Sequence, residues 1–399
     1  MFGGFHRYIF RKSMDSMAVS TAMLASIRTA LVRSLLLLSC LWFGCDSLWA
    51  PFLDNRPNCM SDPSLCSTAD AGLDAGSMDG GTPTALICSK DNWCWESPLP
   101  QGNHIRAVWG TGPNNIWAVG DAGVILKWDG AKWAAQTSGT TTNLYGIWGS
   151  SANSIWAVGL GGLILKWNGT QWLPQTSGTS SSLTGIWGSD AANIWAVGEA
   201  GVILLGNGSS WTVRASGTTA KLNAVWGVST TAVWAVGEGG VIVRWNGSAW
   251  ASQSSATGNA LTAVGGVDAS NVWAVGYVGV VVKWNGSAWS PQTSPTTSNL
   301  HAVWATAAND VWAVGEANAS GGPTLLKYSG ASWASQTAGA IPVLNKQTLR
   351  GLWGSTSSTI WAVGENGVLA NWNGTSWSAQ ATGTRENISH FWGPDASNV

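Results

Sequence analysis

Short apolar segments alternate with turn-forming residues along most of the chain after residue 100. In one typical stretch the apolar segments are 222–226, 232–236, 241–245 and 250–253, each bounded by Gly, Asn or Ser. Short segments rich in Val, Ile and Trp with such boundaries predict β-strands. Asn246-Gly247 lies between the last two segments, and Asn-Gly between apolar segments indicates a tight hairpin turn. No part of this region has a sustained helical period.

This four-segment pattern repeats every 39 residues. The tetrapeptide Trp-Ala-Val-Gly marks each repeat, and a second Trp precedes each copy, with Gly265 substituting once. The last interval is 49 residues, which equals one repeat plus two insertions of five, within 318–323 and 338–347. The Trp residues of the tetrapeptides are Trp117, Trp156, Trp195, Trp234, Trp273, Trp312 and Trp361.

Four antiparallel strands in each repeat make up a β-propeller blade. We therefore predict an all-β chain with seven full blades. Segment 93–98 looks like a lone fourth strand and 390–393 like a lone first strand, so we expect a partial eighth blade that joins the two ends. The last five residues repeat 268–272, which precede Trp273, so we expect a truncated reading frame. A seven-bladed ring with redundant end strands is the alternative.

The Trp content predicts how the blades pack. The chain holds 30 Trp, and the second strand of each repeat is apolar on both faces, as in sheets that are buried on both sides. Because soluble proteins expose few large apolar patches, we expect the tetrapeptide Trp residues to lie between blades. In five repeats a basic residue directly precedes the aromatic position of the third predicted strand. We expect these basic residues to pair with acidic neighbours. They are Lys127, Lys166, Arg244, Lys283 and Lys327.

Several motifs resemble those of known propeller families. Segments 283–289 and 129–133 resemble a shortened Asp-box, the hairpin between the third and fourth strands of sialidase-like propellers. The Trp-Ala-Val-Gly pattern is similar to that of tectonin-type lectin propellers. Residues 93–399 as a whole resemble bacterial tandem-repeat propeller lipoproteins. The resemblance implies the fold, whereas propellers host many activities.

Charge and the scarcity of reactive side chains exclude several classes of function. The net charge is −1, from 19 basic and 20 acidic residues. The chain therefore lacks the cluster of Lys and Arg that a nucleic-acid binder needs. Nucleophile and phosphate-loop motifs are absent. We assign the Arg and His residues beyond residue 100 to different repeat phases, so we expect neither an arginine triad nor a metal or cofactor site. The chain is expected to be non-catalytic, with a divergent glycoside-active enzyme as the alternative.

One position of the repeat is acidic in most of its copies. The residue after Trp-Ala-Val-Gly is acidic in five of the seven repeats, and propeller symmetry would place these side chains on one rim. They could form a ring that binds cations or a basic partner, or they could simply keep the turns soluble. The five are Asp121, Glu199, Glu238, Glu316 and Glu365.

The N-terminal part resembles an export signal. An apolar run at 34–44 follows Arg28 and Arg33 and is too short to span a bilayer. The run ends in a sequence similar to a bacterial lipobox at Cys45, with Cys40 as the alternative. We expect residues 1–45 to be the signal peptide, 46–87 a flexible tether poor in apolar residues, and 88–399 the propeller.

Lipidation of Cys45 would leave four cysteines in the mature chain. An even number in an oxidising compartment predicts two disulfides, which would join Cys59 to Cys66 and Cys88 to Cys94. We therefore expect a monomeric, lipid-anchored scaffold in the outer membrane or periplasm of a Gram-negative cell, with secretion as the alternative. Its partner would be an envelope protein or a glycan, and a lectin-like carbohydrate-binding propeller is the alternative function.

Overall fold

The computed structural model describes residues 10–12, 93–95, 103–318, 321–336, 346–380 and 387–389. The chain divides into two units, Met1–Ser97 and Pro98–Val399. In the first unit the described backbone is one antiparallel pair, β1 (Phe10–Lys12) with β2 (Trp93–Trp95). Segment 93–98 therefore begins with a strand, as expected. The backbone groups of β2 pair with β1, and the predicted joining of the two chain ends stays a prediction.

Most of the predicted export signal and tether lies outside the described residues. The same holds for the candidate lipidation sites and for three of the four cysteines in the predicted disulfides, while Cys94 is described only as backbone in β2. The cysteines outside the described residues are Cys40, Cys45, Cys59, Cys66 and Cys88.

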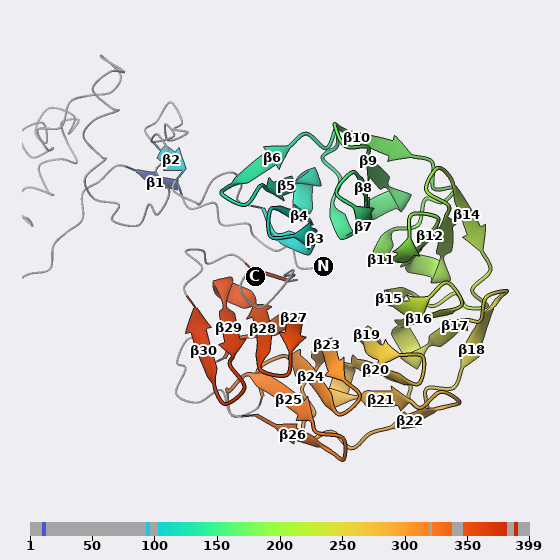
Figure 1. Cartoon of the computed structure of the whole chain (residues 1–399), viewed down its shortest axis with the longest axis vertical. Coiled ribbons are helices and arrows are strands. Elements are labelled where there is room, and N and C mark those ends of the chain that lie inside the picture. Colours follow the sequence, from blue (N-terminus) through green and yellow to red (C-terminus); the bar gives the residue numbers. More distant parts are fainter. Residues whose placement is uncertain are drawn as a thin grey trace, which may run out of the picture. The chain divides into compact units, whose positions relative to one another are not determined.

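The second unit contains seven four-stranded antiparallel sheets in a ring, which confirms the predicted propeller with seven full blades. Figure 1 shows the first strand of each sheet innermost and the fourth outermost. Blade 1 contains β3 (Ile105–Gly112), β4 (Asn115–Gly120), β5 (Ile125–Trp128) and β6 (Trp133–Gln136); blade 2 contains β7 (Leu144–Ser151), β8 (Ser154–Gly159), β9 (Ile164–Trp167) and β10 (Trp172–Gln175); blade 3 contains β11 (Leu183–Asp190), β12 (Asn193–Gly198), β13 (Ile203–Gly206) and β14 (Trp211–Arg214). Blade 4 contains β15 (Leu222–Ser229), β16 (Ala232–Gly237), β17 (Ile242–Trp245) and β18 (Trp250–Gln253); blade 5 contains β19 (Leu261–Asp268), β20 (Asn271–Gly276), β21 (Val281–Trp284) and β22 (Trp289–Pro291). Blade 6 contains β23 (Leu300–Ala307), β24 (Asp310–Gly315), β25 (Thr324–Tyr328) and β26 (Trp333–Ser335); blade 7 contains β27 (Leu349–Thr356), β28 (Thr359–Gly364), β29 (Leu369–Trp372) and β30 (Trp377–Gln380).

The hairpins follow from local sequence. At the Asn-Gly turn of blade 4, the Asn246 side-chain oxygen accepts bonds from the backbone N–H groups of Ser248 (2.9 Å) and Ala249 (3.0 Å). Gly247 has a φ of 100°, a backbone conformation that side chains disfavour. The turn places Trp245 opposite Trp250 in the ladder.

The tetrapeptide Trp residues lie between blades. Trp195 of blade 3 contacts two Trp residues of blade 4, with ring centroids 4.9 Å from Trp245 and 5.0 Å from Trp250. Such tilted and edge-on aromatic pairs add about 0.5–1.5 kcal/mol beyond the burial of their area. Six of the seven are at most 2% exposed, whereas Trp361 of blade 7 is only partly buried.

The inner strands interlock through a Trp and a Gly. Trp187 of β11 lies over Gly227 of β15, where a Cβ atom on the glycine would come within 2.8 Å of the indole ring. Blade 5 has Gly265 in place of this Trp, and the next blade has Ala305 in place of the facing Gly. The two substitutions complement each other, because without the indole there is room for a methyl group.

The start of an eighth repeat follows blade 7. The Asn387 side-chain oxygen accepts a bond from the backbone N–H of Asn366 (3.0 Å), as Asn143 does from Ala122 (2.9 Å) between blades 1 and 2. The next residue, Ile388, donates its N–H to Gly364 (2.9 Å) and forms a parallel bridge with Ile105 of β3. Residues 387–389 thus occupy the place where the first strand of the expected eighth blade would begin, and 390–399 lie outside the described residues (Figure 1).

Candidate functional site

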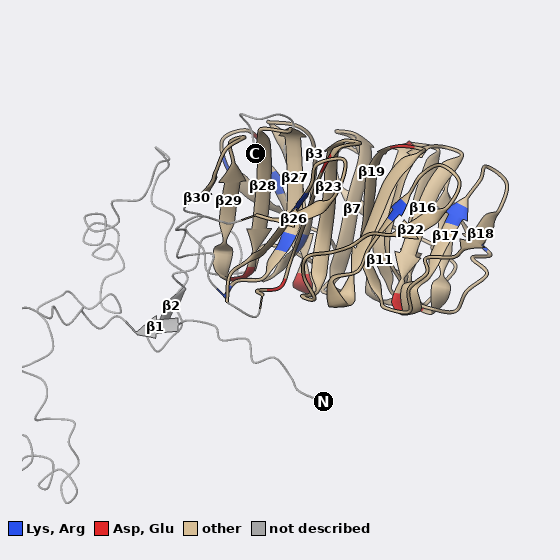
Figure 2. Cartoon of the chain, turned by 90° about the horizontal axis from the view of Figure 1, so that it is seen from below, with Lys and Arg blue, Asp and Glu red and all other residues tan. Residues whose placement is uncertain are grey.

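The turns that follow the second strands form one edge of the ring, which we call the turn face. In six blades the turn is a short 3-10 segment. The turn face is the lower edge of the ring in Figure 2, where acidic residues are visible, while most Lys and Arg lie along the strands. The first N–H of each turn donates to the residue before the inner strand, as Glu238 does to the Lys221 carbonyl (2.9 Å). The six turns are η3 (Asp121–Gly123), η4 (Leu160–Gly162), η5 (Glu199–Gly201), η6 (Glu238–Gly240), η7 (Tyr277–Gly279) and η9 (Glu365–Gly367).

The five acidic residues on this face do not form a uniform ring. Asp121 accepts two bonds from Arg106, at 2.9 Å from Nε and 3.0 Å from Nη2, and Glu365 pairs with Arg350. Among the described residues, the side chains of Glu199 and Glu238 are exposed and have no hydrogen-bond or ion-pair partner.

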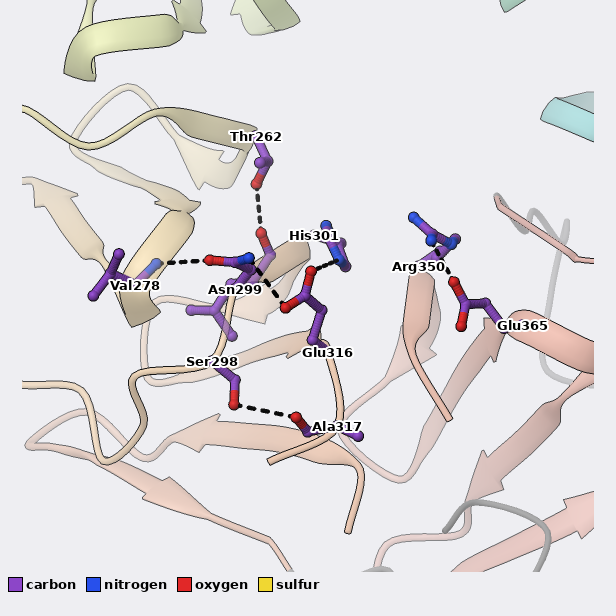
Figure 3. Close-up of polar contacts among 10 residues, drawn as sticks. Thr262, Val278, Ser298, Asn299, His301, Glu316, Ala317, Arg350 and Glu365 are labelled. Carbon is purple, nitrogen blue, oxygen red and sulfur yellow. Dashed lines mark hydrogen bonds and ion pairs between the residues drawn. The ribbon is translucent and has the colours of Figure 1, made fainter. Parts of the chain in front are cut away.

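The fifth acidic residue, Glu316, belongs to a small network. Its carboxylate accepts a bond from Asn299 Nδ2 (3.0 Å) and lies 3.7 Å from His301 Nε2. The oxygen of the same Asn299 amide accepts a bond from the Val278 N–H (2.9 Å) of blade 5. The network therefore joins the turn of blade 5 to the inner strand and turn of blade 6, as Figure 3 shows.

The partners of three of these acidic residues were missed by sequence reasoning. Arg106, His301 and Arg350 each occupy the second position of an inner strand, directly after Ile105, Leu300 and Leu349. Our assignment of the Arg residues to different repeat phases is therefore wrong for Arg106 and Arg350, and His301 shares their position. Aligning the seven inner strands would have revealed the shared position.

Burial keeps His301 uncharged near neutral pH. Desolvation is the main cause that lowers the pKa of His301 below its ordinary value of 6.5, and the positive charge of Arg350 in the next blade lowers it further. Glu316 and Glu365 act in the opposite direction but do not outweigh these causes. The pKa of Arg106 is raised, chiefly by its hydrogen bond to Asp121.

The other half of the ring carries neutral residues at the second position of the inner strand. The Thr184 hydroxyl donates to the Leu222 carbonyl (2.6 Å), and Asn223 Nδ2 donates to the Leu261 carbonyl (2.8 Å). Each bond joins one inner strand to the next. Blades 3 to 5 are thus locked together at this position, whereas blades 7 and 1 present Arg–carboxylate ion pairs and blade 6 presents His301 beside Glu316.

Apolar side chains are exposed on the turn face next to the charged network. Tyr277 is 46% exposed and Val278 is 56% exposed in blade 5, and Leu160 is 46% exposed in blade 2. Tyr and Arg are enriched in protein interfaces. We call the contiguous part of this surface the blade 5–7 arc, and it consists of Tyr277, Val278, Asn299, His301, Glu316, Arg350 and Glu365.

The basic residues of the third strands do not mainly pair with acids, contrary to expectation. Each lies over the tetrapeptide Trp of its own blade, and four of the five also lie over an aromatic ring of the next blade. Only Lys327 has an acidic partner among the described residues, with Nζ 3.2 Å from Asp310. Each cation lies 4.8 to 5.5 Å from the centroid of its own blade's Trp, for Lys127, Lys166, Arg244, Lys283 and Lys327.

The described residues contain no group of three or more His, Cys, Asp or Glu side chains that could hold a metal ion. Within the same part of the chain, no helix is both long and apolar enough to cross a membrane. Two of the five acidic residues of the turn face, Asp121 and Glu365, are held in ion pairs with arginine.

Comparisons with known proteins show the fold. No family model and no curated protein matches the chain. Among solved structures the chain is similar to "YCF48 bound to D1 peptide", with a TM-score of 0.54 and 18% identity over 69% of this chain and 94% of that chain. It is also similar to the computationally designed Ika8 protein (TM-score 0.60, 13% identity, 74% and 92% covered) and the C-terminal WD40 domain of Sif2 (0.54, 12%, 72% and 89%). The chain therefore has the β-propeller fold that these proteins share.

Proposed function

We propose that the chain is a non-catalytic scaffold that docks a protein or peptide partner on the blade 5–7 arc. The observation that carries this proposal is that exposed Tyr277 and Val278 share this arc with the Arg350–Glu365 ion pair, whose arginine remains accessible. The Arg350 side chain is 37% exposed while it holds Glu365. An apolar anchor with a polar, charged rim is the usual arrangement of a protein-binding patch.

The similarity to a propeller that was solved with a bound peptide supports this proposal. At 18% identity it carries no information on the partner, so the partner's chemistry is inferred from this chain alone. The arc offers guanidinium donors, carboxylate acceptors and an aromatic anchor. We infer a partner segment with an apolar residue flanked by charged or polar ones.

A matched pair of variants tests the docking surface. The full chain, immobilised and exposed to a cell-envelope extract, should retain a partner. Tyr277→Ser should reduce the amount of partner retained about tenfold or more, because interface aromatics often contribute about 2 kcal/mol to the free energy of binding. Val213→Ser is the control, since Val213 is 53% exposed on an outer strand away from the turn face. Equal retention by both variants would exclude the arc as the docking surface.

We also propose that the protein is exported and anchored to the cell envelope through lipid on Cys45. This proposal rests on the charged and apolar segments that precede Cys45 in the sequence. Metabolic labelling with palmitate should be lost in Cys45→Ala and retained in Cys40→Ala. Labelling that disappears only in Cys40→Ala would assign the anchor to Cys40. If the unchanged protein takes up no palmitate, the chain carries no lipid anchor.

A further inference from the structure

One turn of the turn face departs from the repeat at two adjacent positions. Blade 5 has Tyr277 where five other blades have an acidic residue, and Val278 follows it where the five other 3-10 turns have Ala, Gly or Asn. Both side chains are exposed, Tyr277 at 46% and Val278 at 56%. The residues that correspond to Val278 are Ala122, Gly161, Ala200, Gly239 and Asn366.

Val278 is held in a backbone conformation that its side chain disfavours. Its φ is 58° and its ψ is 32°, which places it in the left-handed region. A β-branched residue is rare in this region, whereas Gly and Asn adopt it far more readily and Ala has no branch at Cβ. Because more than half of the Val278 side chain is exposed, burial does not offset the free energy that the conformation costs.

Hydrogen bonds fix this strained turn. The Tyr277 N–H donates to the Ala260 carbonyl (2.9 Å). The Val278 N–H donates to Asn299 Oδ1 (2.9 Å), and Nδ2 of the same amide donates to Glu316 (3.0 Å), as Figure 3 shows. Strained residues persist where the surrounding structure fixes them, and they cluster at ligand-binding sites. The two exposed side chains therefore stand on a rigid backbone, so a partner that binds them needs to order little.

The turn of blade 2 shows that an exposed apolar residue does not require this strain. Leu160 occupies the position of Tyr277 and is 46% exposed, but Gly161 follows it. A glycine adopts the positive φ there (67°) without a steric penalty. Single exposed apolar residues are common on protein surfaces, whereas a second, strained apolar residue beside the first distinguishes the turn of blade 5 from the others.

Carboxylates lie on both sides of this turn. Glu238 of blade 4 is exposed and has no hydrogen-bond or ion-pair partner among the described residues, and the Glu316 side chain of blade 6 is 45% exposed. With Glu199 of blade 3, the turns of blades 3 to 6 carry three carboxylates. The described lysines at this edge are Lys221, whose carbonyl accepts the Glu238 N–H, and Lys346. Three carboxylates against two ammonium groups leave a negative surround, which attracts basic groups and repels acidic ones.

We infer that Tyr277 and Val278 are the apolar anchor for a basic partner, namely a protein surface whose apolar patch is flanked by Lys or Arg. The inference rests on the proposed docking on the blade 5–7 arc and specifies the partner for that surface. The branched side chain of Val278 supplies apolar contact area that Ala, Gly or Asn cannot. An anionic lipid surface fits less well, because the flanking carboxylates repel it.

Selection from a phage library of short random peptides tests this inference, with the immobilised full chain as target and Val278→Asn for counter-selection. The selected peptides should combine apolar residues with Lys or Arg and should bind Val278→Asn about tenfold or more weakly. Asn occupies this position in blade 7, so the variant removes the apolar group and relieves the strain together. Its melting temperature should rise by about 2 °C or more, which a general loss of structure would not produce.

Two control variants separate contact from strain and from charge. Ala122→Val creates the same strain in the turn of blade 1, where Asp121 precedes it. It should lower the melting temperature and leave peptide binding unchanged. Glu238→Gln should weaken binding of the selected peptides severalfold and make it less sensitive to salt, because one carboxylate that faces their basic residues is removed.

Several results would overturn the inference. They are equal peptide binding by Val278→Asn, a lower melting temperature of that variant, selected peptides rich in Asp and Glu, or no peptide that depends on Val278. Self-association of the chain that Val278→Asn abolishes would make a second copy the occupant and would also overturn it. Retention of an envelope partner that Tyr277→Ser reduces is a separate measurement, so docking on the arc can stand when the basic partner fails.

Discussion

Lys283 of blade 5 reaches across to blade 6, with its Nζ 5.2 Å from the ring centroid of Tyr328. The same ammonium lies 4.9 Å from the ring centroid of Trp273 in its own blade. A cation between two aromatic rings joins consecutive blades at the depth of the third strand. Arg244 makes the same arrangement between Trp234 and Trp284.

Replacing Lys283 by Met should destabilise the propeller. Met keeps an apolar stem of similar length but removes the charge, so the loss reports the cation–π contribution, about 0.5–2 kcal/mol. Urea unfolding would measure the change in the free energy of unfolding. Lys132→Met is the control, because Lys132 is exposed in a hairpin, and an equal loss in both variants would show that the aromatic rings contribute nothing.

Trp234 and Trp361 should differ in their contribution to stability. Trp234 is fully buried, with its ring centroid 6.3 Å from Trp284 of the next blade, whereas Trp361 lies in blade 7, the last full blade, and is partly exposed. Trp234→Ala should cost about 3–5 kcal/mol, and Trp361→Ala clearly less. Denaturant unfolding of both variants measures this difference, and equal costs would mean that Trp361 is as well packed as the other six.

Titration of His301 should make the propeller less stable in mild acid. Burial and Arg350 lower the pKa of this imidazole in the folded state below its ordinary value of 6.5, so the unfolded chain binds the proton more readily. The contribution is therefore fully present above about pH 6.5 and is lost as pH falls through the folded-state pKa. His301→Gln should show a smaller drop in melting temperature between pH 7.5 and 5.5 than the unchanged protein. An equal drop in the two proteins would show that His301 titrates normally.

The sequence predicted those features that one repeat contains in itself. The strands, the Asn246-Gly247 hairpin and the seven full blades follow from local pattern and period, because hairpin pairing depends on residues close along the chain. Contacts between blades were harder to foresee. The cations over neighbouring aromatic rings depend on where side chains of adjacent sheets meet.

Two features of the sites needed the repeats to be aligned position by position. Arg106, His301 and Arg350 share the second place of an inner strand, and Val278 replaces the Ala, Gly or Asn of the other 3-10 turns. Both signals lie in the sequence. The contacts of the three inner-strand side chains with acidic residues in the turns, and the positive φ of Val278, are visible only in three dimensions.

The interlock between inner strands should tolerate a methyl group at one blade and not at another. In Gly227→Ala the new Cβ would come within 2.8 Å of the Trp187 ring and of the Ala232 carbonyl oxygen, so the strands must move apart. Overpacking of this kind costs about 1–3 kcal/mol. Thermal unfolding should show a clear loss for this variant.

Gly258→Ala is the matched control, because a Cβ at Gly258 would meet nothing within 4 Å. This variant should melt close to the unchanged protein. The complementary test is Gly265→Trp, which should destabilise blade 5 because the new indole would face Ala305 rather than Gly. Adding Ala305→Gly should recover a large part of that loss, since contacting residues couple by about 0.5–3 kcal/mol in double-mutant cycles. If the two substitutions were simply additive, Gly265 and Ala305 would not be a complementary pair, and the Trp-over-Gly contact would not determine how neighbouring blades fit together.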